Sequence, residues 1–200
     1  MNWLAHVYLS RPEVDFRLGN LLADVKKGQS WPGTSLAFAE GERCHYAIDA
    51  FTDAHPLVHR SIRRLGSTGL LRGIAIDLIY DHYLSLHWQT FARSPLREFL
   101  ESFYRDLPGR DSRLPEAAEA FLTALVRSDR LGNYQAPEAV LGAMYRTDSR
   151  LSSRARSRGA IASFYPAFLK DYSQLEKDFL DFFPELIASI DQQWNVSDQF

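Results

Sequence analysis

The middle of the chain concentrates side chains that can bind a metal ion or move a proton. Residues 45–88 contain five of the six histidines, together with four closely spaced aspartates. Two pairs in this stretch have members four positions apart, and a histidine follows the second pair. These residues are His45 and Asp49, Asp77 and Asp81, and His82. Residues four apart on an α-helix have Cβ atoms about 5–6 Å from each other, so each pair can converge on one ion.

A divalent cation would relieve the repulsion between aspartates held this close together. Burying such carboxylates without a partner is costly, and a metal removes that penalty as well. Mixed imidazole and carboxylate ligands suit manganese, iron or zinc better than calcium, which prefers an all-oxygen shell. A bound ion lowers the pKa of water and polarises a phosphoryl oxygen, while a nearby His or Asp takes the proton. Phosphoester hydrolysis is the reaction that this set fits.

A structural explanation of the same pairs stands beside the metal hypothesis. A single His–Asp pair at helical spacing is more often a surface ion pair or a hydrogen-bonded core pair than a metal site. Here two pairs lie close together in the chain. In addition, Asp77 and Asp81 sit in an otherwise apolar segment, where charged groups are rarely buried without a partner. These two observations raise the metal hypothesis to about equal weight.

Other polar residues give weaker signals on their own. His6 is flanked by apolar residues, and a histidine on such a face is more often a satisfied core residue than a ligand. Asp24 can equally end a helix, and Asp53 can cap the helix expected after the next proline. His59 and His87 have no partner at a suggestive spacing, so we expect structural or surface positions for both.

Arginines form a second group of interest. Arg146, Arg150 and Arg154 lie four positions apart and would share one helix face. A solvated helix end is the more common outcome for such a run. The alternative is a docking surface for an acidic partner, or a grip on a substrate phosphate, because guanidinium pairs bidentately with both carboxylate and phosphate.

Helical periodicity governs the segments that must position these residues. Apolar spacing predicts helices over 36–52, 57–65 and 70–91, with a break before Pro56. Further helix-like segments are 19–28, 95–109, 114–128, 136–153 and 164–195, the last with an expected kink at Pro184. Alternating strand patterns and long linkers are absent, so the sequence predicts one all-α domain, a helical bundle spanning residues 1–200.

Composition excludes several classes of protein. The chain is 46% hydrophobic and 24% charged, with a formal net charge of -2, which is typical of a soluble globular protein and argues against nucleic-acid binding. Cys44 is the only cysteine, so no intramolecular disulfide can form and a reducing cytosol is expected. No basic leader and no window of about 20 apolar residues are found, which predicts a cytoplasmic protein without a membrane partner.

Four separated motifs resemble one known family. They are NWLAHVYL at 2–9, GNLLAD at 19–24, HYAIDAFTDAHP at 45–56 and DLIYDHYLSLHW at 77–88. In this order and approximate spacing they are similar to the acyl carrier protein phosphodiesterases. The resemblance implies an all-helical, manganese-dependent enzyme, distantly related to the His–Asp metal phosphohydrolases. Such an enzyme cleaves phosphopantetheine from the serine of holo acyl carrier protein.

The resemblance also assigns roles to individual residues. It implies Asp24, His45, Asp49 and Asp77 as metal ligands. His6, Asp81 and His82 are expected to transfer protons, to support a ligand or to contact the phosphate. The superfamily is named for an adjacent His-Asp dipeptide, which this chain lacks; it has Asp81-His82 in the reverse order. The division between ligands and their supporting residues therefore stays open.

The implied substrate suggests that the arginines bind an acidic protein. Acyl carrier proteins of this class are strongly acidic, so a net-negative enzyme can bind them only through a local basic patch. The candidates are the run around Arg146, Arg150 and Arg154, and the group Arg60, Arg63 and Arg64. Two alternatives remain: a metal phosphohydrolase acting on a small nucleotide-like substrate, and a helical binding module whose His and Asp residues only form buried hydrogen bonds.

Overall fold

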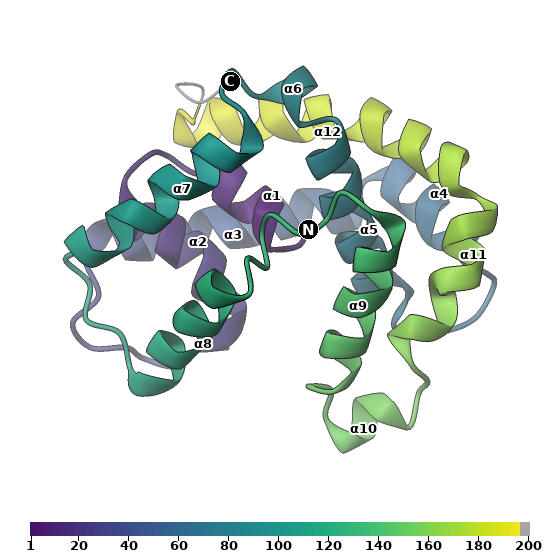
Figure 1. The fold of residues 1–200 in the computed structure, drawn as a ribbon, viewed down its shortest axis with the longest axis horizontal. Coiled ribbons are helices and arrows are strands. Elements are labelled where there is room, and N and C mark those ends of the chain that lie inside the picture. The colour runs from purple at the N-terminus through teal and green to yellow at the C-terminus, as the bar shows by residue number, and fades with distance from the viewer. Residues whose placement is uncertain (197–200) are drawn as a thin grey trace.

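The computed structural model describes residues 1–196, and every regular element in that range is helical (Figure 1). The α-helices are α1 (Trp3–Tyr8), α2 (Val14–Lys26), α3 (Leu36–Ala54), α4 (Pro56–Arg64), α5 (Arg72–Leu86), α6 (Trp88–Phe91), α7 (Leu96–Asp106), α8 (Glu116–Arg127), α9 (Pro137–Asp148), α10 (Ser153–Arg156), α11 (Tyr165–Lys170) and α12 (Tyr172–Trp194). Two 3-10 turns, η1 (Leu107–Gly109) and η2 (Ile161–Phe164), complete the set. The predicted all-α class is confirmed. No helix in this range has the length and apolar character needed to cross a membrane.

Local signals in the sequence set most of the helix boundaries. The Ser35 hydroxyl accepts a hydrogen bond from the Phe38 amide and so caps the start of α3. At the other end, Pro56 begins α4, and the Nδ1 atom of His55 caps that helix by accepting from the Leu57 amide. The prediction that Asp53 caps α4 is therefore wrong. The single helix expected over 70–91 is also wrong, because the chain breaks into α5 and α6 at His87.

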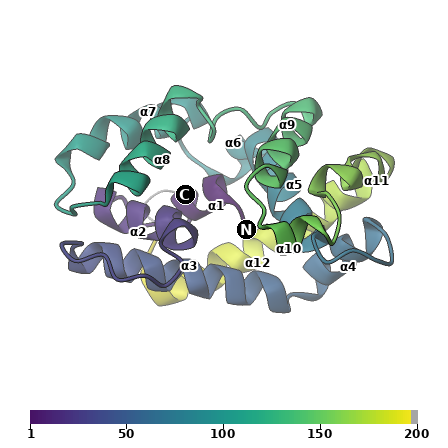
Figure 2. The same ribbon diagram turned by 90° about the horizontal axis from the view of Figure 1, so that it is seen from below.

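The helices α2 and α3 lie in direct backbone contact (Figure 2). A Cβ atom added to Gly19 would lie 1.9 Å from the Phe38 carbonyl oxygen, and one added to Gly41 would lie 2.0 Å from the Phe16 carbonyl oxygen. Each glycine thus lets the main chain of the opposite helix approach where no larger residue fits. This contact fixes the distance between side chains that project from the two helices.

The helix α5 runs through the core, where Ile76, Ile79 and Tyr83 are fully buried. It packs against α1, α4, α9 and α12, so its polar side chains must find partners inside the protein. The long helix α12 lies along one side of the molecule and packs against α3, α4 and α5 (Figure 1). The core therefore gathers segments from both ends of the chain around α5.

A buried carboxylate joins α12 to α4. Asp178 is 1% exposed and forms ion pairs with Arg60 at 2.6 Å and with Arg64 at 2.8 Å. It also accepts a hydrogen bond from the Ser61 hydroxyl at 3.0 Å. Arg60 and Arg64 are therefore committed to an intramolecular pair, which removes them from the group proposed to dock an acidic carrier.

Candidate metal centre

Two histidine rings from different helices stack next to one carboxylate. His6 comes from α1 and His45 from α3, and their ring centroids lie 4.1 Å apart with 22° between the planes. The Nε2 atom of His6 lies 3.3 Å from Asp49 Oδ1, and that of His45 lies 3.1 Å from Asp49 Oδ2. One ligand atom from each of these three residues falls within 4.8 Å of the other two, so the set can hold one ion.

A single residue of α2 orients both rings. The side-chain oxygen of Asn20 lies 2.7 Å from His6 Nδ1, and its main-chain oxygen lies 2.8 Å from His45 Nδ1. Because both oxygens can only accept, each Nδ1 carries the proton and donates it. Both Nε2 atoms then face Asp49, and that of His6 also lies 3.2 Å from the Met1 carbonyl oxygen. An Nδ1 partner that fixes the tautomer is the usual arrangement for a metal-binding histidine.

Two further carboxylates lie beside this set. Asp24, near the end of α2, has its Oδ1 atom 3.5 Å from His45 Nε2. Asp77, on α5, is linked to the set through the N-terminal ammonium of Met1, which lies 3.2 Å from Asp77 Oδ1 and 3.2 Å from Asp49 Oδ1. Within the residues that the structure describes, only His6, His45 and Asp49 form a group that could hold one ion, and Asp24 and Asp77 border it.

These donors fit the divalent metal that the family resemblance implies. The buried Nε2 atom of His45 makes no hydrogen bond of good geometry and faces the oxygens of Asp24 and Asp49. A lone pair facing carboxylate oxygens is unfavourable unless a proton or another cation lies between them. The ammonium of Met1 already bridges Asp49 and Asp77 as such a cation. Imidazole nitrogens with carboxylate oxygens are the donor set that suits manganese, iron or zinc.

The electrostatics of the set also favour a cation. Burial alone would lower the pKa of His45, but Asp24 and Asp49 outweigh it and raise that pKa to about 9. Burial would raise the pKa of Asp49, yet His45 and His6 hold it well below its ordinary value. Burial lowers the pKa of His6. The carboxylates therefore favour the charged form of His45, whereas burial favours the neutral form of His6.

Asp81 lies apart from this set and has a different use. Its Oδ2 atom accepts from the Leu4 amide and from the Asn2 side chain, both at 2.9 Å, and its Oδ1 atom accepts from the Ala5 amide at 3.1 Å. Fully buried, it satisfies the free amides at the start of α1. Asp81 thus holds in place the helix that carries His6, and it does not converge with Asp77 on an ion.

His82 is also engaged elsewhere. Its Nδ1 atom lies 2.5 Å from the Tyr134 carbonyl oxygen, and its Nε2 atom lies 2.7 Å from the Tyr172 hydroxyl. Both ring nitrogens therefore have partners in the core. Seven residues were proposed for metal binding or proton transfer. The structure brings together His6, His45 and Asp49 and places Asp24 and Asp77 beside them. Asp81 and His82 lie in supporting contacts elsewhere.

A cavity of about 560 Å³ opens beside the cluster. Asp24, Asp77 and the N-terminal residue line it, and Arg150 lines it from the segment after α9. The Arg150 guanidinium lies over the ring of Trp3, 5.7 Å from its centroid. The cavity therefore connects the proposed metal ligands to one of the arginines singled out by their spacing.

Two more guanidinium groups lie near Arg150. Burial lowers the pKa of Arg150, and the positive charges of Arg130 and Arg146 lower it further. Within residues 1–196, none of these three arginines forms an ion pair. Arg154 is exposed on α10 and does not line the cavity. The structure thus adds Arg130 to the predicted basic patch, a residue outside the run of arginines that the sequence spaces four positions apart.

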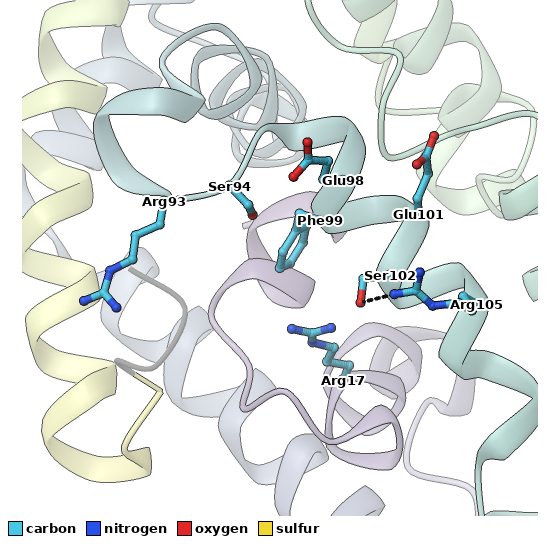
Figure 3. Close-up of a pocket in the computed structure, with 8 residues that line it drawn as sticks. All are labelled: Arg17, Arg93, Ser94, Glu98, Phe99, Glu101, Ser102 and Arg105. Atoms are coloured by element: carbon cyan, nitrogen blue, oxygen red, sulfur yellow. Dashed lines mark hydrogen bonds between the residues drawn. The ribbon is translucent and has the colours of Figure 1, made fainter.

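A second cavity, of about 570 Å³, lies by α7 (Figure 3). Its lining mixes basic and acidic side chains, and Ser102 hydrogen-bonds Arg105 there at 3.1 Å. The Arg17 guanidinium lies over the ring of Phe99, 5.0 Å from its centroid. No histidine lines this cavity, and we assign no chemistry to it.

A comparison with protein families now identifies the group to which these residues belong. The model of the family described as acyl carrier protein phosphodiesterase matches residues 1–186. The chain belongs to this family. The resemblance noted from four motifs is thereby confirmed, and the class of enzyme that the family name denotes is a phosphoric diester hydrolase.

Individual relatives carry the same name over almost their whole length. An acyl carrier protein phosphodiesterase from Pectobacterium atrosepticum is 26% identical over 190 residues, covering 94% of this chain and 96% of the relative. One from Photorhabdus laumondii is 29% identical over 199 residues, covering 96% of each chain. One from Escherichia coli O157:H7 is 29% identical over 199 residues, with 94% and 96% covered. No solved structure matches this chain.

Proposed function

We propose that this protein is a manganese-dependent phosphodiesterase that acts on holo acyl carrier protein. It hydrolyses the phosphodiester between phosphopantetheine and the carrier serine, releasing phosphopantetheine and the apo carrier. The observation that carries the proposal is the set of His6, His45 and Asp49, whose ligand atoms lie within 4.8 Å of one another. Asp24 and Asp77 lie beside this set, next to His45 and the N-terminal ammonium respectively. Membership of the phosphodiesterase family supports the reaction class.

In this proposal Asp24, His45, Asp49 and Asp77 hold the metal, and His6 completes the set from α1. When bound, the metal supplies an acidified water and polarises the phosphoryl oxygen. The contacts with Asn20 keep both Nε2 atoms directed toward Asp49, where they would be free to bind the metal once the second ring proton of His45 is lost. Asp24 and Asp77 also line the cavity. Protons exchanged between the protein and the substrate would therefore be transferred in this cavity.

The basic patch of Arg130, Arg146 and Arg150 would dock the acidic carrier. Three guanidinium groups that form no ion pair within residues 1–196 repel one another, and carboxylates of a partner protein would remove that repulsion. Replacing both Arg146 and Arg150 with glutamate should raise KM for the carrier at least tenfold at low salt, with a smaller change at high salt. Arg158→Glu, an exposed change outside the patch, is the control. Equal effects of the two variants would remove the patch from the binding surface.

The decisive experiment weighs the carrier before and after incubation. Holo carrier is mixed with the protein and manganese, with and without a chelator, and its mass is measured. We expect loss of the phosphopantetheine mass only when free manganese is present. An unchanged carrier, together with hydrolysis of a nucleotide substrate, would support the small-molecule phosphohydrolase instead. An unchanged carrier and no bound metal would support a helical binding module.

A further inference from the structure

The cavity beside the cluster has one apolar wall. Its apolar lining comes from five segments, namely α1, α2, α5, α8 and the segment after α9: Trp3, Val25, Ile74, Leu78, Phe121 and Leu151. Its volume of about 560 Å³ lies within the roughly 300–1,000 Å³ of cavities that bind small molecules. Since Asp24 and Asp77 line the same cavity, a ligand can touch the proposed metal ligands and the apolar wall together.

The aromatic residues of this wall leave little room for a flat ring to stack. Trp3 and Phe121 meet edge to face, with ring centroids 5.0 Å apart and 85° between the planes. The Arg150 guanidinium lies over the Trp3 ring. A nucleobase that stacked on Trp3 would compete with these two contacts, whereas a branched aliphatic chain only needs apolar surface.

We propose that this cavity binds the pantetheine arm of the substrate, an inference that rests on the proposed function. The phosphate end lies by Asp24 and Asp77, and the methyl and methylene groups of the arm pack along Ile74 and Phe121. Pantetheine also carries two amides and a hydroxyl. Lys27, which lines the cavity and has no acidic partner within residues 1–196, can donate to an amide oxygen.

Binding of free pantetheine to the metal-free protein tests the cavity without any catalysis. Ile74 is 36% exposed on α5, so Ile74→Trp can fill the cavity without replacing a core residue. Saturation-transfer NMR should detect pantetheine on the wild type, and Ile74→Trp should weaken its affinity at least ~10-fold. Leu86→Trp, at a 45% exposed position of the same helix outside the cavity, should bind like the wild type. Failure of the wild type to bind pantetheine, or equal binding by both variants, would overturn the assignment.

Kinetics separate this inference from the proposed function. We compare kcat/KM for holo carrier with kcat/KM for bis(4-nitrophenyl) phosphate, a diester without the arm. The ratio of the two should fall about tenfold or more in Ile74→Trp, because KM for the holo carrier rises. Thermal melting followed by circular dichroism verifies that the variant is folded. If the wild type cleaves holo carrier and the ratio stays constant, the cavity assignment fails and the function stands. If the wild type leaves holo carrier intact while pantetheine still binds in the cavity, the proposed function fails.

Discussion

At the scale of single residues, Asp49 is the side chain on which the cluster depends. It touches both imidazoles and the N-terminal ammonium, so its removal takes away the ligand that the other donors share. Asp49→Ala should weaken manganese binding at least ~100-fold, measured by calorimetry and by metal analysis after dialysis. Asp53→Ala, one turn further along α3, should retain the metal. Full metal content in the Asp49 variant would show that the ion binds elsewhere.

We expect replacement of Asp81 to lower the stability of the fold and to affect activity only as a consequence. An amide at this position cannot accept hydrogen bonds on both of its heavy atoms, so Asp81→Asn leaves at least one buried N–H of the α1 start without a partner. We expect a loss of about 1–3 kcal/mol in the free energy of unfolding, measured in urea. Asp53→Asn serves as the control. A variant of normal stability with no activity would contradict this assignment and favour the catalytic role expected for Asp81.

The sequence predicted which residue types would gather but not which side chain each would meet. Spacing placed Asp77 and Asp81 on one face of a helix, and both do lie on α5. However, several helices pack around α5, so residues one turn apart on it meet different partners. Asp77 lies beside the cluster, whereas Asp81 binds the amides at the start of α1. Asn20 was missed for another reason. Asn20 orients His45 through its main-chain oxygen, and the type of a residue does not reveal the direction of its carbonyl group.

At the scale of elements, the contact between α2 and α3 sets the spacing of the proposed ligands. In Gly41→Ala the new methyl group would overlap the Phe16 carbonyl oxygen, which forces the two helices apart. We expect a loss of about 1–3 kcal/mol in the free energy of unfolding, together with weaker manganese binding. Gly73→Ala in α5 has open space around its Cβ position and should stabilise the protein by up to about 1 kcal/mol. Similar melting temperatures for the two variants would argue against the close contact.

Helix positions were predictable where the chain carries explicit start and stop signals. Proline marks the first turn of α4 and of α9, and both helices begin there. The signals were absent at His87 and at Asp171, where the structure divides segments that periodicity had joined. Pro184 lies within the continuous helix α12. Apolar spacing alone does not predict the breaks at His87 and Asp171, because the apolar pattern continues across a single non-helical residue.

At the scale of the whole molecule, the pair between α4 and α12 should make stability depend on pH. Burial raises the pKa of Asp178, but Arg64, Arg60 and Ser61 outweigh it and hold that pKa below its ordinary value. The stability that the pair contributes is therefore fully present above the unfolded pKa of about 4 and is lost as pH falls toward the folded pKa.

Asp178→Asn isolates this contribution. At pH 7 we expect a loss of about 3 kcal/mol in the free energy of unfolding, because two arginines lose their partner. The difference from the wild type should shrink as pH falls below about 4, since the wild-type carboxylate is then protonated too. Urea unfolding at several pH values measures the loss at pH 7 and its change with pH, and Glu101→Gln serves as an exposed control. A difference that stays constant with pH would exclude the charged pair as its source.

The close approach of α2 and α3 also has a consequence for the order of folding. Only the short segment 27–35 joins these two helices, so their contact closes a small loop, whereas α12 must return from the far end of the chain to reach α4. We expect the α2–α3 hairpin to form first, which gathers Asp24, His45 and Asp49 before the remaining helices dock. Manganese should then speed refolding in stopped-flow experiments; a metal that only slowed unfolding would place the assembly of the centre after the rate-limiting step.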